Sequence, residues 1–162
     1  MLKSNALKKH HILAILLLIP TLIFSQEISF EQHTVISDNS DGYGRPRIVL
    51  TNNNNPLIIW RKDATPKVLK ASKWNGNSFS APYEILQAGI LPSSWDGPEA
   101  ASKGDTIYIV FTSLASSQSS IMLIKSFDGG ITFSDTLRVS ESLAGHKYRM
   151  ANIEINENGQ PI

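Results

Sequence analysis

Apolar and polar residues alternate in short runs along most of this chain. A period of two, with many Ile, Val and Phe residues, is typical of β-strands that bury one face. Polar turn sequences such as NNNN, KGD and ENG separate the runs, which include residues 56–60 and 107–111. The pattern predicts an all-β protein. Its first strands are expected at about 47–51, 56–60, 67–72 and 79–86, with a second set between 98 and 140.

The strand pattern repeats along the sequence. SKWNGNSF at 72–79 aligns with SFDGGITF at 126–133 at an offset of 54, and residues 48–58 align with 153–162 at an offset of 105. A repeated unit of four antiparallel strands with this period is the blade of a β-propeller. We therefore predict one blade at 45–86, a second at 98–140, and the start of another at 149–162.

Residues 30–37 resemble the fourth strand of each predicted blade but have no first three strands before them. We expect this segment to be a ring-closing outer strand that completes a blade supplied from the far C-terminal end. The sequence stops after a first strand and a turn, at residue 162. The expected domain at 26–162 is thus an incomplete propeller, truncated to about two blades plus part-blades of a ring of about six.

The first 25 residues have the pattern of a secretory signal peptide. Three lysines precede an apolar run at 12–24, which ends at the small residue Ser25. The run suits the apolar core of a signal peptide better than a membrane span, and a retained anchor is the alternative. We expect cleavage after Ser25 and a secreted, periplasmic or cell-surface location, with no membrane attachment after cleavage.

Charge and composition exclude several classes of function. Without residues 1–25 the chain has 12 lysines and arginines against 14 acidic residues, a net charge of −2, and no polybasic run. This argues against nucleic acid as a partner. The chain has no cysteine, so disulfides and thiolate metal sites are excluded. Only His33 and His146 remain after cleavage, so we expect no metal and no cofactor.

The segment at 126–133 resembles the Asp-box, or BNR repeat, of the sialidase (neuraminidase) superfamily. The resemblance covers about residues 30–162, and 72–79 is a degenerate copy with Trp74 in place of the aspartate. In that family the box is a structural turn between the third and fourth strands of a blade. The resemblance therefore implies that Asp128 caps its own turn. The motif residues are Ser126, Asp128, Gly130, Thr132 and Phe133.

The resemblance also implies where a sugar would bind. Sialidases hold the sugar carboxylate with three arginines, the first of which opens the first inner strand. Arg45 and Arg47 are the candidates here, although neither matches the family motif fully. Asp63 lies in the loop that carries the family's acid/base aspartate; a solvated charged turn is the alternative reading. The other two arginines and a Tyr–Glu pair are expected beyond residue 162, so the fragment alone should be inactive.

Two further segments contain candidate substrate-binding residues. Tyr148 and Arg149 resemble the arginine motif at the start of a later blade, and Trp95 lies in a loop where it could stack on a sugar. Two functions remain open at this point. One is a secreted exo-α-sialidase, a glycoside hydrolase acting on terminal sialic acids when full length. The other is a non-catalytic secreted propeller that binds glycans or extracellular proteins.

Overall fold

The computed structural model describes residues 33–37, 39–42, 44–86, 92, 96–113, 119–141 and 145–162. The chain divides into two units, Met1–Thr34 and Val35–Ile162. The second unit contains all of the strands described below. The predicted leader at 1–25 and Trp95 lie outside the described residues, as do residues 30–32 of the segment 30–37.

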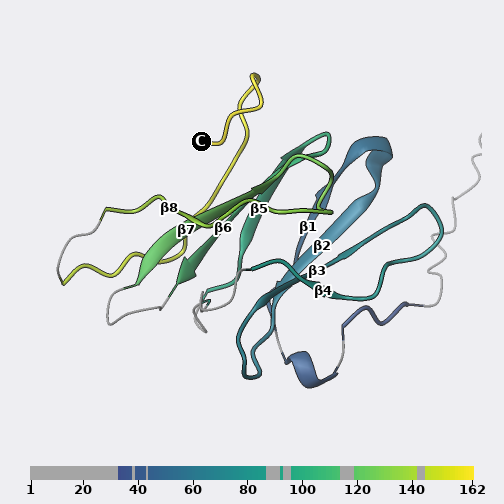
Figure 1. Cartoon of the computed structure of the whole chain (residues 1–162), viewed down its shortest axis with the longest axis horizontal. Coiled ribbons are helices and arrows are strands. Elements are labelled where there is room, and N and C mark those ends of the chain that lie inside the picture. The colour runs from purple at the N-terminus through teal and green to yellow at the C-terminus, as the bar shows by residue number, and fades with distance from the viewer. Residues whose placement is uncertain are drawn as a thin grey trace, which may run out of the picture. The chain divides into compact units, whose positions relative to one another are not determined.

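The described residues form two four-stranded antiparallel sheets, in which strands that follow one another in the chain are neighbours in the sheet (Figure 1). The first sheet contains β1 (Arg47–Leu50), β2 (Pro56–Arg61), β3 (Leu69–Lys73) and β4 (Tyr83–Glu84). The second contains β5 (Glu99–Lys103), β6 (Thr106–Ser113), β7 (Ser120–Ser126) and β8 (Leu137–Arg138). The predicted all-β class with four-stranded antiparallel blades is confirmed.

Strand positions agree with the sequence pattern except at the fourth strands. We expected a strand over 79–86, but only Tyr83–Glu84 pairs with β3, and Phe79 forms an isolated bridge with Trp74. Pro82 has no N–H to donate to a neighbouring strand, which interrupts a continuous ladder. The alternation of apolar residues therefore overestimates the length of β4.

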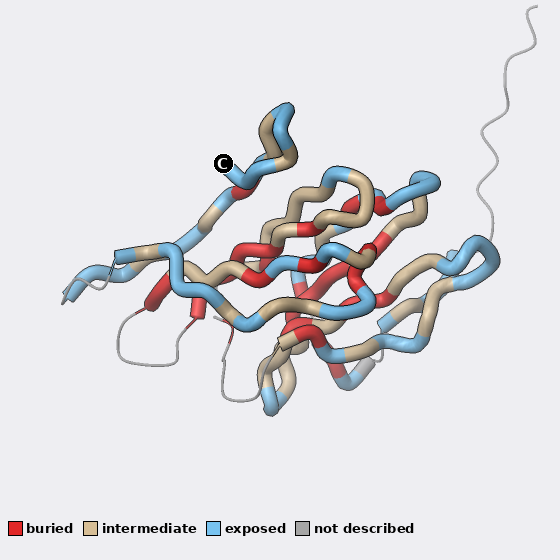
Figure 2. The backbone as a smooth tube through the Cα atoms, turned by 45° about the horizontal axis from the view of Figure 1, so that its top comes forward, coloured by how far each residue is buried: buried red, intermediate tan, exposed pale blue. Residues whose placement is uncertain are grey.

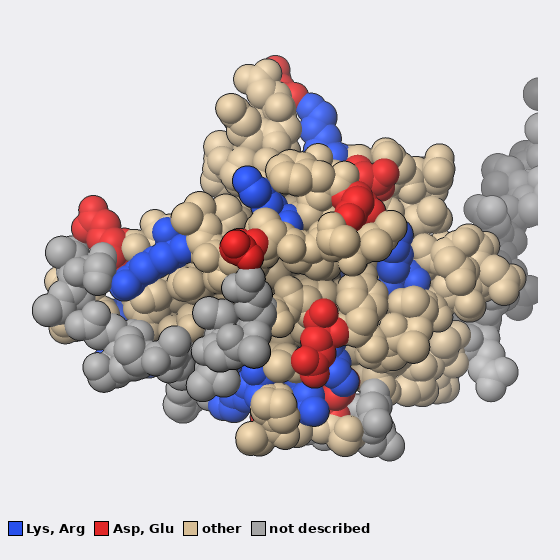
Figure 3. Space-filling model, viewed as in Figure 1, with Lys and Arg blue, Asp and Glu red and all other residues tan. Residues whose placement is uncertain are grey.

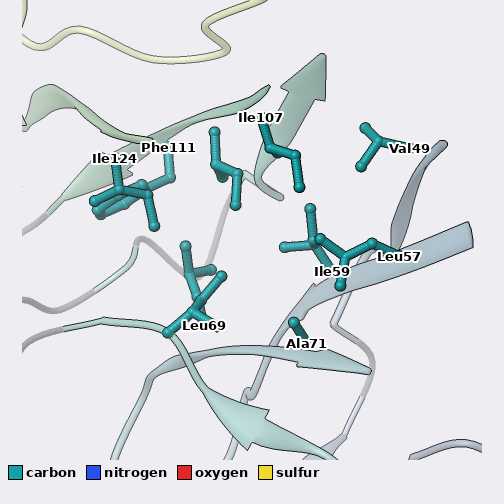
Figure 4. Close-up of a cluster of buried hydrophobic side chains, with 10 residues drawn as sticks. Val49, Leu57, Ile59, Leu69, Ala71, Ile107, Phe111 and Ile124 are labelled. Carbon is teal, nitrogen blue, oxygen red and sulfur yellow. The ribbon is translucent and has the colours of Figure 1, made fainter. Parts of the chain in front are cut away.

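The hydrophobic core lies between the two sheets. Alternate side chains of β2, such as Leu57 and Ile59, are fully buried and pack with Ile107 and Ile109 of β6 (Figure 4). Burial is concentrated along the strands and falls at the turns, as Figure 2 shows. The residue spacing of two thus places one face of each sheet in a shared apolar cluster, which is the main source of stability for sheet packing.

The first strands of the two sheets are neighbours. Ser102 in β5 donates a hydrogen bond to the carbonyl oxygen of Leu50 in β1, at 2.7 Å. The turns after β1, β3, β5 and β7 lie at one end of the sheets, which we call the turn end. The starts of β1 and β5 and the loops after β2 and β6 lie at the opposite end, which we call the pocket end. Up-and-down strand order fixes this division.

The segments outside the two sheets are short. Glu154 and Ile162 exchange backbone hydrogen bonds of 3.0 and 2.9 Å and close a terminal hairpin, and Lys103 in β5 donates to the carbonyl oxygen of Glu157. Residues 33–37 are not in a strand. The ring-closing role of 30–37 and the assignment of 149–162 to a next blade stay predictions. In the described part of the chain, no helix is long and apolar enough to cross a membrane.

Candidate functional site

Asp128 lies in the turn after β7, and its carboxylate binds that turn. We call residues 126–133 the Asp128 turn. The backbone N–H groups of Ile131 and Thr132 donate to Asp128 Oδ1 at 3.0 and 2.9 Å, and the Ser126 hydroxyl donates to the same oxygen at 2.8 Å. The predicted hydrogen bonds of Asp128 to its own turn are confirmed.

The same hydrogen bonds control the charge of Asp128. Burial acts to raise the pKa of the carboxyl group, but the hydrogen bonds donated by Thr132, Ser126 and Ile131 outweigh it and lower the pKa to about 2. A carboxylate held in this way is a poor proton donor near neutral pH. Asp128 therefore has the features of a capping residue and not those of a general acid.

The Asp128 turn also contacts the first sheet. The hydroxyl group of Tyr83 in β4 donates to the carbonyl oxygen of Gly130 at 2.6 Å. Burial, and secondarily the negative charge of Asp128, raise the pKa of Tyr83 to about 12. Gly130 has φ +87°, and a Cβ atom there would lie 2.8 Å from a methyl group of Leu57. The turn therefore packs so closely against the first sheet that only glycine fits.

A pocket with a volume of about 220 Å³ lies at the pocket end, between the start of β1, the start of β5 and the segment after residue 149. Charged side chains of both signs line it, and Figure 3 shows acidic and basic residues interspersed over the face in view. Its lining residues are Arg45, Arg47, Asp96, Gly97, Glu99, Met150, Ala151 and Asn152.

Arg47 is bound to Glu99 across the two sheets. Its Nε donates to Glu99 Oε2 at 2.6 Å, its Nη2 donates to Glu99 Oε1, and its Nη1 donates to the carbonyl oxygen of Pro46 at 3.1 Å. Hydrogen bonding to Glu99 raises the pKa of Arg47, against the opposing effect of burial. Each guanidinium nitrogen thus has an acceptor, and Glu99 occupies the fork that would bind a carboxylate ligand.

Arg45 differs from Arg47 because the structure shows no hydrogen bond or ion pair from its guanidinium group to any described residue. The residue is exposed and has φ +47°. Gly97 makes room for its side chain, since a Cβ atom at position 97 would lie 2.7 Å from Arg45 Cβ. Of Arg45 and Arg47, Arg45 is therefore the one that can bind an anion without first losing a partner.

Asp63 is held by a buried arginine. Arg61, which is 2% exposed, donates from Nε and Nη2 to Asp63 Oδ1, the first at 2.7 Å. Its Nη1 donates to the carbonyl oxygen of Asp96 at 2.5 Å. An unpaired charge buried this deeply would be costly, so the ion pair stabilises the loop.

Two aspartates that the sequence analysis did not single out organise the pocket end. Asp41 is fully buried and accepts hydrogen bonds from Trp60 Nε1 at 3.2 Å and Lys70 Nζ at 2.6 Å. Asp96 Oδ2 accepts from Thr112 Oγ1 at 2.9 Å and the Met150 N–H at 3.3 Å. A sequence signal existed, because an Asp-Gly pair precedes the first strand of each sheet, at 41–42 and 96–97.

The pocket lining includes neither Tyr148 nor Arg149. Tyr148 is half-buried and stacks on His146 with ring centroids 6.3 Å apart, and Arg149 is exposed. Trp95 lies outside the described residues. Among the residues that the structure describes, no group of three or more His, Asp or Glu side chains could hold a metal ion.

Eighteen chains of solved structures are similar to this chain. The solved structure of Hadza microbial sialidase Hz136 is similar to this chain at 15% sequence identity and a TM-score of 0.48, over 70% of this chain and 30% of that chain. This chain therefore spans about 30% of the length of that sialidase. The sequence matches no family model and no curated protein. The fold assignment rests on the strand pairing of the two sheets and not on this likeness.

Proposed function

We propose that the pocket at Arg45 binds the carboxylate of a sugar acid, in an exported, sialidase-like propeller protein. The observation that carries this proposal is the exposed Arg45 guanidinium group, which borders the pocket and has no partner among the described residues. Sialic acid is the sugar class that the resemblance of residues 126–133 to the Asp-box implies. The signal-peptide pattern at 1–25 supports export.

The geometry at Arg45 suits a carboxylate. A guanidinium group presents parallel N–H donors that match the two oxygens of a carboxylate, and such bonds are stronger than neutral ones. The pocket volume of about 220 Å³ is enough for a carboxylate and part of a sugar ring. Asn152 adds an amide to the lining that can bind sugar hydroxyl groups.

We extend the proposal to hydrolysis only for a longer protein that contains this chain. The resemblance assigns Asp63 the acid/base role and expects the other essential residues, namely two arginines and a Tyr–Glu pair, beyond residue 162. In an exo-α-sialidase these groups would surround the same sugar. For these 162 residues, the proposed activity is sugar binding without turnover.

A non-catalytic binding protein is the second candidate, and one observation favours it. Two of the residues that the resemblance assigns to the site are already bound within the protein, Arg47 by Glu99 and Asp63 by Arg61. A site that needs only Arg45 and neighbouring polar groups would bind a glycan without cleaving it.

Ligand-observed NMR with α-methyl sialoside tests the binding proposal. We expect the chain to bind the sialoside and to lose this binding when the sugar carboxylate is converted to its methyl ester. Arg45→Gln should weaken binding about tenfold or more, since a charge-assisted hydrogen bond is lost. Arg138→Gln, which removes an exposed arginine from β8, is the matched control and should leave the affinity unchanged. Equal binding of acid and ester would refute the proposal.

A fluorogenic sialoside separates the two candidate functions. We expect no hydrolysis by the 162-residue chain. Turnover by this chain would contradict the placement of essential arginines outside it. For a longer protein, hydrolysis that is lost in Asp63→Asn would support the sialidase, while binding without hydrolysis would support the non-catalytic alternative.

A further inference from the structure

Glu99 changes the charge that the pocket offers to a ligand. Both of its carboxylate oxygens accept hydrogen bonds from Arg47, and this ion pair is partly exposed, with 41% of the Arg47 side chain and 28% of the Glu99 side chain accessible. A ligand that approached Arg47 would have to compete with Glu99. Within the pocket lining, the positive charge of Arg47 is therefore cancelled before any ligand arrives.

The remaining charges favour a ligand with a single negative charge. Arg45 is the pocket cation without a partner among the described residues, and the carboxylate of Asp96 lies in the same lining. Asp96 is itself bound through Oδ2 to Thr112 and Met150, which fixes its position. The first anionic group of a ligand is attracted by Arg45, whereas a second one meets the carboxylate of Asp96 and no further free cation among the described lining residues.

We propose that Glu99 is a specificity-determining residue of this pocket: by occupying Arg47, it restricts the pocket to sugars that carry one negative charge and rejects those with two. The proposal rests on the proposed function, in which Arg45 binds a sugar carboxylate. In this proposal Arg47 does not contact the ligand. It affects binding only because it forms the ion pair with Glu99.

The test is the affinity of wild type, three pocket variants and one control variant for α-methyl sialoside and for the same sialoside carrying an added sulfate group. Wild type should bind the sulfated sugar more weakly. Glu99→Gln should bind the parent sialoside about three- to tenfold more tightly at low salt, because the net charge of the pocket rises by one. It should also lose most of the discrimination against the sulfated sugar.

A double-mutant cycle separates this role from direct binding by Arg47. Arg47→Gln leaves the Glu99 carboxylate without its cation, so affinity should fall about three- to tenfold. The double variant Arg47→Gln/Glu99→Gln restores the wild-type net charge of the pocket and should bind within about twofold of wild type, because the two opposite charge changes cancel at the ligand. If Arg47 contacted the sugar carboxylate, the double variant would instead stay as weak as Arg47→Gln.

Glu84→Gln is the matched control, because it removes one exposed negative charge from β4, outside the pocket lining. It should change neither affinity nor discrimination. The Arg47–Glu99 pair is partly exposed, so we expect every variant to fold, and thermal melting checks this. Unchanged affinity in a folded Glu99→Gln variant would overturn this proposal alone, whereas absence of sialoside binding by wild type would overturn it together with the proposed function.

Discussion

Asp128 at the turn end differs from Glu99 and Asp96 at the pocket end in where its hydrogen-bond partners come from. At the turn end, Asp128 accepts hydrogen bonds from residues two to four positions away. At the pocket end, Glu99 binds an arginine 52 positions away, and Asp96 binds a backbone N–H 54 positions away. The first arrangement stabilises one turn, and the second joins separate segments around a pocket. Among these three carboxylates, the separation of the partners in the sequence distinguishes the one that caps a turn from the two that line the pocket.

Gly130→Ala should give the largest effect and break the turn end while sparing the pocket. Alanine at φ +87° is strained, and its Cβ atom would overlap a methyl group of Leu57. We expect the free energy of unfolding to fall by about 2–4 kcal/mol, from backbone strain and overpacking together. Urea denaturation measures the loss.

Gly76→Ala is the matched control for this substitution. Gly76 has φ +97°, but nothing lies within 4 Å of the position that a Cβ atom would occupy. The substitution should therefore lower the free energy of unfolding only through backbone strain at positive φ, by about 1 kcal/mol. An equal loss of stability in both variants would show that overlap of the new Cβ atom with Leu57 adds nothing to the destabilisation by Gly130→Ala.

Asp128→Ala should have the next largest effect on stability. Loss of the capping bonds should lower the free energy of unfolding by about 0.5–2 kcal/mol, with sialoside affinity unchanged in the folded fraction. The folded pKa of about 2 lies below the ordinary value of 3.8, so this stability is present above pH 4 and is lost as the pH falls from about 4 to 2.

Denaturation at several pH values measures the effect. The difference between wild type and Asp128→Ala should shrink over that pH range. Glu141→Ala, which removes an exposed carboxylate, should change neither stability nor its pH dependence. Selective loss of sugar binding in a folded Asp128→Ala variant would contradict the separation of the two ends.

Tyr83→Phe should have the smallest effect, since it removes one hydrogen bond, that to Gly130, and leaves the ring in place. We expect a loss of about 0.5–1.5 kcal/mol. The folded pKa of about 12 exceeds the ordinary value of 10.0, so wild-type stability should be full below pH 10 and fall between pH 10 and 12. The variant should lack this contribution.

Tyr108→Phe is the control for the alkaline experiment. Its hydroxyl group makes only a longer contact, 3.4 Å to the carbonyl oxygen of Gly159. Its loss should change stability less than the loss of the Tyr83 hydroxyl group. If wild type and Tyr83→Phe lost the same stability between pH 10 and 12, ionisation of Tyr83 would not be the cause of that loss.

The features predicted correctly from the sequence depend on local spacing. The period of two located the core strands β2 and β6, because alternate residues such as Leu57 and Ile59 face one apolar cluster. Likewise, the hydrogen bonds of Asp128 follow from the spacing within its own turn. The extent of β4 was wrong because pairing depends on which N–H groups meet β3, and apolar alternation does not encode this.

The pocket could not be derived in the same way. Arg45 and Arg47 were both reasonable candidates for an anion, since they differ by only two positions in the sequence. The structure separates them because Glu99, on the other sheet, binds Arg47 and leaves Arg45. Similarly, the burial of Asp41 depends on Trp60 and Lys70, which only the folded chain brings to it. The roles of these residues thus depend on partners far away in the sequence, which local sequence patterns do not reveal.

The hydrogen bond from Tyr83 to Gly130 also bears on the order of folding. These residues are 47 positions apart, so the contact forms only after the first sheet has positioned β4. The Asp128 turn can close by itself, but its docking waits for the sheet that precedes it in the chain. The contact therefore couples the two repeats, and each stabilises the other through it. During synthesis, the ribosome delivers the first sheet before the turn that docks on it emerges, which suits assembly in that order.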